Sequence, residues 1–172
     1  MKLTENTAYL LTLGFPDSIA QQIMKLRTQL FSLVKHISFV SLPPMIALAW
    51  QHEPFPPLSH LHLPTPPSPS LFSSLKERNN ALFLVHGTEA FALWFSQLAV
   101  HRECTEDVQE VLFPIVPGIF LGNPGTYRLP ITNVPQIRIS DWRLQHYRIK
   151  TLYDRENLVH VRYALLDDLH LR

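Results

Sequence analysis

A proline-rich stretch in the middle of the chain, residues 53–74, places the strongest limit on the fold. Its sequence, EPFPPLSHLHLPTPPSPSLFSS, contains seven of the 15 prolines of the chain. Proline fixes φ and lacks a backbone N–H, so this stretch cannot form a helix and can join a sheet only at an edge. We therefore expect either a linker or a pair of short edge strands joined by a rigid loop, with the main elements before and after it.

Length and composition indicate a globular protein with a hydrophobic core. The 172 residues match the size of one domain, and 46% of them are hydrophobic while 17% are charged. A formal net charge of +1 provides no strong field for nucleic acid, so any contact with RNA would depend on a local patch. Cys104 is the only cysteine, which excludes an internal disulfide and a thiolate metal cage. The N-terminal apolar run is too short for a signal peptide or a membrane span, and we expect a cytoplasmic protein.

The segment before the proline-rich stretch predicts strands alternating with helices. Residues 8–15 form a short apolar run that ends in Gly-Phe before a proline, which is typical of a central strand. A helix follows, with an apolar stripe at three- and four-residue steps formed by Ile19, Ile23, Leu26, Leu30 and Leu33. KHISFVSL, residues 35–42, then predicts a second strand, and MIALAWQ, residues 45–51, predicts a short helix after two prolines.

The segment after the proline-rich stretch repeats this order and closes with a hairpin. Residues 79–87 predict a strand, and residues 88–104 predict a helix capped by Thr88. The apolar stripe of this helix is interpreted as core and comprises Phe91, Trp94, Phe95 and Leu98. Residues 111–135, with five prolines and three glycines, predict a strand interrupted by loops. Two alternating strands, residues 136–154 and 158–171, complete an α+β fold that ends in an antiparallel sheet.

Several separate stretches resemble the two-histidine (2H) phosphoesterases, the group that includes 2′,5′ RNA ligase-like proteins and cyclic phosphodiesterases. YLLTLGFPDSIAQQIMKL resembles the opening strand and helix of the family, and HISFVSL resembles its first H-x-[ST]-hydrophobic motif. RNNALFLVHGTEAFALWFSQL resembles the start of the second half, and RLQHYRIKTLYDRENLVHVRYALLDDLHL resembles the closing hairpin. The resemblance covers nearly the whole chain. It implies a single domain, residues 1–172, with two pseudo-repeated lobes of antiparallel sheet backed by helices, a central cleft, and the proline-rich connector within it.

The resemblance implies a catalytic role for His36 and Ser38. In the family, two histidines face each other across the cleft, so that one removes a proton from the attacking oxygen while the other protonates the leaving oxygen. Each Ser or Thr two positions further on donates a hydrogen bond to a phosphate oxygen, and no metal or cofactor is needed. The second motif is absent here: residues 114–117 read Pro-Ile-Val-Pro, and an alternative register places Pro130 at the histidine position and keeps only Thr132. Catalysis by two histidines is therefore in doubt.

The closing hairpin provides candidate substrate-binding residues. Trp142, His146 and Arg148 share one face, on which an aromatic ring could stack on a base and Arg could bind phosphate. A solvated face of a terminal sheet is the equal alternative, and the same two interpretations apply to His160 and Arg162.

Other polar residues have simpler explanations. His60 and His62 could line a metal or phosphate site, but no Cys or acid pair stands at ligand spacing, so we interpret them as exposed edge-strand side chains. His86 and His101 flank the second helix and could replace the lost histidine, although neither is followed by Ser or Thr two positions on. The pair Asp167-Asp168 is interpreted as surface charge.

These observations lead to two functional hypotheses and a third, weaker one. The first is a diverged 2H phosphoesterase-like protein that acts on or binds a phosphodiester or 2′,3′-cyclic phosphate of RNA or a nucleotide. The second is a catalytically inactive family member that serves as a binding or scaffold protein, and the third is RNA ligation through a 2′,5′ linkage. We expect no membrane and no metal partner, and the sequence leaves the oligomeric state open.

Overall fold

The computed structural model describes residues 3–98, 115–124, 134–154 and 157–171. In chain order, the elements are β1 (Leu3–Gly14), α1 (Asp17–Val34), the short 3-10 helix η1 (Ile37–Phe39), β2 (Ile46–Gln51), the short 3-10 helix η2 (Leu58–His60), β3 (Ser70–Arg78), β4 (Ala81–His86), α2 (Glu89–Ser96), β5 (Gly118–Gly122), β6 (Ile137–Ile139), β7 (Trp142–Asp154) and β8 (Asn157–Leu171).

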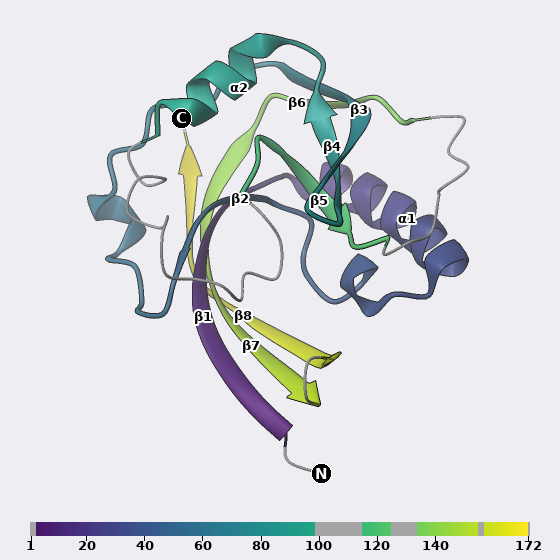
Figure 1. The fold of residues 1–172 in the computed structure, drawn as a ribbon. Helices are drawn as coiled ribbons and strands as arrows, with labels where there is room; N and C mark the ends of the chain where they lie inside the picture. The colour runs from purple at the N-terminus through teal and green to yellow at the C-terminus, as the bar shows by residue number, and fades with distance from the viewer. Residues whose placement is uncertain (1–2, 99–114, 125–133, 155–156, 172) are drawn as a thin grey trace.

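Within these residues, the strands form two antiparallel four-stranded sheets. Their strand orders are β2-β1-β7-β8 and β5-β4-β3-β6. The edge strands β2 and β5 are in contact, and the N–H of Phe120 donates to the carbonyl oxygen of Met45 over 3.2 Å. The first sheet is strongly curled, with β1, β7 and β8 bending together (Figure 1). The predicted α+β class is confirmed at this level.

The predicted first strand and first helix are confirmed. β1 extends beyond its predicted apolar run because its whole length pairs with β7, from Leu3 opposite Asp154 to Gly14 opposite Arg143. The predicted stripe of α1 buries Ile23, Leu26 and Leu30, whereas Leu33 is exposed. The helix contacts β5 and β6 of the second sheet, so an element from the start of the chain supports strands from its second half.

Two predictions around the Pro43-Pro44 pair are wrong. Residues 35–42 form no strand, because Lys35 adopts left-handed φ and ψ of 60° and 18°, ends α1, and leads directly into η1. Residues 45–51 form no helix: β2 pairs with β1 and is buried along nearly its whole length. A strand buried on both faces has a continuous apolar run, and periodicity alone cannot distinguish such a run from a buried helix.

The proline-rich connector is irregular up to Pro69, apart from η2, and then enters β3. Side-chain hydrogen bonds attach the connector to the second half of the chain. Trp94 Nε1 donates to the carbonyl oxygen of Pro64 at 3.1 Å, and Ser68 Oγ donates to the carbonyl oxygen of Ser140 at 3.0 Å. The alternation of SHLHL forms no strand, since η2 occupies its first part. Residues 53–69 therefore form a linker, as one of the two predictions stated, and residues 70–74 belong to the strand β3.

The predicted elements of the second half are confirmed in part where the structure describes them. The single strand predicted over residues 136–154 is wrong, because this stretch forms two strands, β6 and β7, that belong to different sheets, and the predicted helix ends at Ser96, before residues 97 and 98. β4 leads into α2 with Thr88 at the N-cap, and the helix buries its predicted apolar stripe. β7 and β8 form the predicted antiparallel hairpin, with two irregularities where β8 carries an extra residue. Among the described residues, β5 is the one strand in the stretch 111–135, where an interrupted strand was expected. Residues 99–114 and 125–133 lie outside the described residues.

The buried hydrophobic side chains form two clusters that occupy opposite faces of β4. Leu82 and Leu84 belong to the larger cluster, which includes the buried apolar residues of both helices. Ala81 and Phe83 point the other way, into a smaller cluster that includes residues of β1, β2 and β7. In the described residues, no helix is long and apolar enough to cross a membrane.

Candidate functional site

His36 and Ser38 lie together at the end of α1 and bond to each other. The Ser38 hydroxyl is 2.7 Å from His36 Nδ1, and it also accepts a hydrogen bond of 2.7 Å from the backbone N–H of Asn123. One assignment satisfies both contacts: the hydroxyl donates to Nδ1, and the ring carries its proton on Nε2. The His36 ring is exposed and Ser38 is buried. The pair therefore connects the turn after α1 to the residue that follows β5.

Arg27 lies beneath this pair and was missed by the sequence analysis. Its side chain is fully buried, and its guanidinium donates to three carbonyl oxygens: Ser38 at 3.0 Å, Leu42 at 2.6 Å and Leu121 at 3.1 Å. Burial lowers the pKa of Arg27 to about 10. A signal was present in the sequence, because Arg27 stands four residues after Ile23 on the apolar side of the helix. The segment that carries H-x-S is thus held by a buried cation.

The structure does not bring Trp142, His146 and Arg148 to one accessible surface. Trp142 is 1% exposed, and its ring packs against Phe72 and Phe91. His146 is 5% exposed, and Arg148 is exposed on the same strand. Of the three, only Arg148 can therefore contact a ligand without a change in packing.

His146 has an unusual environment for a histidine. Its ring lies 5.8 Å from that of Tyr9 and 5.4 Å, edge-on, from that of Phe55, and its buried Nε2 has no hydrogen-bond partner among the described residues. Burial lowers the pKa of His146, and the nearby charge of Asp167 opposes this shift. The imidazole is therefore held neutral inside the fold.

The remaining histidine candidates are engaged in local contacts or exposed. Nε2 of His86 accepts a hydrogen bond from the N–H of Leu71 at 3.0 Å, and Nδ1 lies 2.8 Å from the carbonyl oxygen of Thr88. The backbone N–H of Thr88 donates to the same Nδ1 at 2.8 Å, and the Thr88 hydroxyl lies 2.9 Å from it. The Nε–H of Arg162 donates to His160 Nε2 at 3.0 Å on the surface of β8. His86 thus shapes a turn, and neither nitrogen is free for catalysis.

The described residues form no metal site. His60 and His62 are exposed on the connector. A group of three or more His, Cys, Asp or Glu side chains able to hold an ion does not occur among the described residues. His101, Pro130 and Thr132 lie outside those residues.

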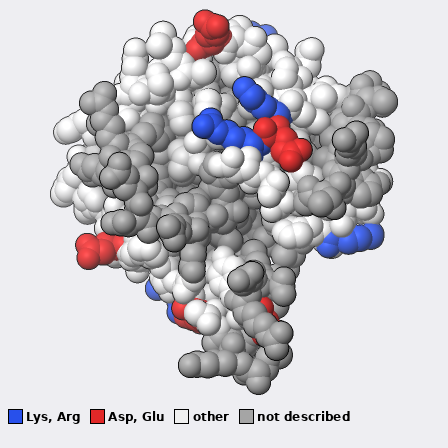
Figure 2. All heavy atoms as spheres, in the orientation of Figure 1, with Lys and Arg blue, Asp and Glu red and all other residues white. Residues whose placement is uncertain are grey.

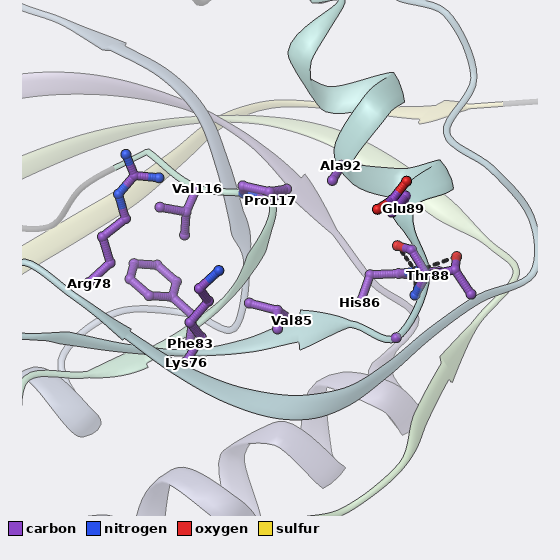
Figure 3. Close-up of a pocket in the computed structure, with 11 residues that line it drawn as sticks. Lys76, Arg78, Phe83, Val85, His86, Thr88, Glu89, Ala92, Val116 and Pro117 are labelled. Atoms are coloured by element: carbon purple, nitrogen blue, oxygen red, sulfur yellow. Dashed lines mark hydrogen bonds between the residues drawn. The ribbon is translucent and has the colours of Figure 1, made fainter.

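A cavity of about 370 Å³ lies on the face of β3 and β4 that carries Phe83 (Figure 3). Its apolar lining comprises Phe83, Val85, Ala92, Val116 and Pro117. Val116 and Pro117 belong to the stretch at which the resemblance places the second H-x-[ST] motif. The cavity therefore lies against the position of the missing half-site.

Opposite charges lie toward opposite ends of this cavity. Lys76 and Arg78 stand two residues apart on β3, paired with Phe83 and Ala81 of β4, so both point to the cavity face. Neither makes an ion pair with a described residue. Figure 3 shows Glu89 at the other end, beside His86 and Thr88 at the start of α2. Lys76 and Arg78 were not predicted as site residues, although cations at every second position of a strand share one face.

On the face shown in Figure 2, the Lys and Arg side chains of the described residues form no extended basic area. The Lys and Arg side chains of the described residues are scattered there, and acidic side chains lie among them. This agrees with the net charge of +1 and favours a small, local site over a long groove for nucleic acid.

A scan of protein-family models, a search among curated proteins and a search among solved structures each find no match to this chain. The geometry of the described residues is therefore the basis for assigning a function.

Proposed function

We propose that this protein is a diverged 2H phosphoesterase-like protein that binds a phosphodiester or 2′,3′-cyclic phosphate of a nucleotide or RNA end without hydrolysing it. The observation that carries the proposal is the pair of cations, Lys76 and Arg78, above the apolar floor of the cavity. A guanidinium and an ammonium group are the side chains best suited to phosphate oxygens, and the apolar floor suits a ribose or base.

The two sheets support the family proposal. Two antiparallel sheets that meet edge to edge, with a helix after the first strand and another after β4, resemble the two pseudo-repeated lobes expected of a 2H protein. The cavity adjoins Val116 and Pro117, where the second half-site of that family is expected. The proposal therefore retains the family's ligand class and its position in the fold.

The contacts of His36 argue against hydrolysis. Its described hydrogen-bond partner is Ser38, whose hydroxyl also accepts the N–H of Asn123, so the pair stabilises a turn. Hydrolysis of the family type needs a base and an acid on opposite sides of phosphorus, and residues 115–117 supply neither. A binding role requires only the charges and the apolar floor.

Glu89 favours one phosphate class over another. A phosphodiester or cyclic phosphate carries one negative charge, whereas a terminal phosphate carries nearly two at neutral pH. A carboxylate at the same cavity repels a doubly charged phosphate about twice as strongly as a singly charged one. It therefore reduces the advantage that Lys76 and Arg78 give to a terminal phosphate, and it penalises adenosine 3′-monophosphate more than 2′,3′-cyclic adenosine monophosphate.

Calorimetric titration with these two nucleotides and a 2′,5′-linked dinucleotide tests the proposal. The double variant Lys76→Ala, Arg78→Ala should weaken binding of the cyclic nucleotide by roughly tenfold or more, equivalent to about 1.4 kcal/mol. Lys25→Ala, which removes an exposed cation from α1, is the matched control and should bind as the unmodified protein does. Glu89→Gln should strengthen binding of adenosine 3′-monophosphate more than that of the cyclic form.

A hydrolysis assay on the same nucleotides, run beside His36→Ala, separates binding from catalysis. We expect no turnover by either protein. Turnover that disappears in His36→Ala would show an active two-lobed site and contradict the non-hydrolytic role. Failure of the unmodified protein to bind any of the three nucleotides would leave the scaffold role suggested by the sequence.

A further inference from the structure

The edge strand β8 exposes an unusual group of apolar side chains. In the described part of the chain, seven large hydrophobic side chains are exposed, and three of them, Tyr163, Leu165 and Leu166, fall within four positions of β8 at 45–49% exposure. Single exposed hydrophobic residues are ordinary, but a group on one strand marks a contact surface. β8 also ends the order of its sheet, so no described strand pairs with its outer edge.

An extra residue in β8 determines which of its side chains share a face. His146, Arg148 and Lys150 alternate along β7 and therefore point to one face, opposite Asp167, Ala164 and Arg162 respectively. Leu166 has no counterpart on β7, so two residues instead of one separate Ala164 from Asp167. Arg162, Ala164 and Asp167 thus lie on one face of β8. Tyr163 and Leu165 lie on the other, opposite Ile149 and Tyr147.

The two charged residues on this face make local hydrogen bonds, and the charge of Arg162 also acts on the nearby carboxylate of Glu5, whose pKa Lys150 and Arg162 lower together. Arg162 donates to His160, and the carboxylate of Asp167 accepts the backbone N–H groups of Leu58 and Asp168. Neither residue forms an ion pair with any described residue. A carboxylate accepts up to about four hydrogen bonds, so Asp167 retains capacity for a guanidinium.

We propose that β8 pairs with β8 of a second copy of this chain, antiparallel and about a two-fold axis at Ala164. In this register, a small side chain meets its own copy on the axis. Each Arg162 then lies opposite Asp167 of the other copy on one face. On the other face, each Tyr163 lies opposite the exposed Leu165 and Leu166 of the other copy. This interface is independent of the phosphate site proposed above.

Self-complementarity favours a second copy over an unrelated strand. Arg162 lies two residues before Ala164 and Asp167 lies three residues after it. Because the bulge at Leu165 and Leu166 takes up one pairing position, antiparallel pairing with the bulge retained brings opposite charges together twice. Parallel pairing in register would place Arg162 against its own copy. Backbone pairing of a single edge buries little area, so we expect a reversible dimer that depends on concentration.

Sedimentation velocity on a concentration series provides the first test. The unmodified protein should show a monomer–dimer equilibrium. Arg162→Asp and Asp167→Arg should each raise the dissociation constant at least tenfold, because each creates two like-charge contacts. An equimolar mixture of the two variants should regain the original constant, since the heterodimer restores both opposite-charge contacts. Leu93→Lys, which alters an exposed apolar residue on α2, is the control and should dimerise normally.

Cross-linking at position 164, on the proposed two-fold axis, provides a second test. It leaves intact the hydrogen bond from the Leu58 N–H to Asp167, which Asp167→Arg removes. In a Cys104→Ser background, Ala164→Cys should form a disulfide-linked dimer under mild oxidation, because opposed residues of paired strands lie within disulfide range. Leu93→Cys in the same background should not. A monomer at every concentration, unchanged dimerisation of Arg162→Asp, or no cross-link at position 164 would each overturn the proposal. A monomeric protein whose β8 binds a strand of another protein would identify a different occupant.

Discussion

Nη1 of Arg27 donates a hydrogen bond to the carbonyl oxygen of Leu42 over 2.6 Å, in a fully buried position. The same guanidinium reaches Ser38 and Leu121, so one side chain of α1 satisfies carbonyl groups of the loop before β2 and of β5. The Arg27 guanidinium thus supplies hydrogen-bond donors to buried carbonyl groups at places where the backbone pairing is irregular.

Replacement of this cation should therefore destabilise the protein strongly. We expect Arg27→Met to lower the free energy of unfolding by about 3 kcal/mol or more, because three buried carbonyls each lose a donor at a cost of about 1–3 kcal/mol. Urea unfolding measures the change. Lys25→Met, on an exposed position of the same helix, should change it by less than about 0.5 kcal/mol.

Ser38 and His36 should differ in their effects on stability. Ser38→Ala removes the acceptor of the Asn123 N–H from a buried site, and we expect a loss of about 1–3 kcal/mol in the free energy of unfolding. His36→Ala removes an exposed ring and should cost less than about 1 kcal/mol. Thermal unfolding compares the two variants. Equal losses, or a larger loss in His36→Ala, would contradict the role of Ser38 as the anchor of this turn.

Burial of His146 predicts a pH-dependent contribution to stability. Its pKa in the folded state lies below the ordinary histidine value of 6.5, so the unfolded state binds more protons between the two values. Stability should therefore fall as the pH is lowered through 6.5 and level off below the folded-state pKa, with a slope of at most about 1.4 kcal/mol per pH unit. Tyr9, Phe55 and Asp167 surround this ring, and only Asp167 carries a charge.

His146→Phe should remove this contribution while it keeps an aromatic ring between Tyr9 and Phe55. We expect the free energy of unfolding of the unmodified protein minus that of His146→Phe to fall as the pH is lowered from 7.5 toward 5. Urea titrations at a series of pH values measure the difference. Parallel curves would show that His146 is protonated equally easily in both states.

Gly122 at the end of β5 should tolerate no side chain. It adopts φ of +153°, and an added Cβ would lie 2.5 Å from Cδ1 of the buried Phe39. Gly122→Ala is expected to cost about 1–3 kcal/mol, since it combines backbone strain with overlap against η1. Gly87→Ala is the matched control, because its added Cβ would first meet the Ser73 hydroxyl at 3.1 Å, and it should cost clearly less in the same urea assay.

Elements whose signals are local could be predicted from the sequence. The stripe of α1, the apolar residues of α2 and most of the alternation of β7 each follow from burial of one face. β2 could not, because its burial on both faces depends on β1, β5 and the strands beyond them. An Ala- and Leu-rich run has a helical preference of its own, and the surrounding sheet overrides it.

The candidate site was harder to predict than the fold. His36 and Ser38 alternate as if on a strand, but the left-handed turn at Lys35 carries no glycine to reveal it, and Arg27 holds the turn through contacts with Ser38 and Leu42. Lys76 and Arg78 face a cavity that exists only where β3, β4, α2 and Val116 come together. Such convergence of distant segments leaves no trace in local sequence.

The position of β1 also has a consequence for synthesis on the ribosome. β1 leaves the exit tunnel well before β7, its partner along its whole length, which begins at Trp142. Until β7 emerges, the described strand that can pair with β1 is β2, and only from Tyr9 onward. During this interval the nascent chain therefore carries an unpaired, apolar strand edge, which is the kind of segment that chaperones bind.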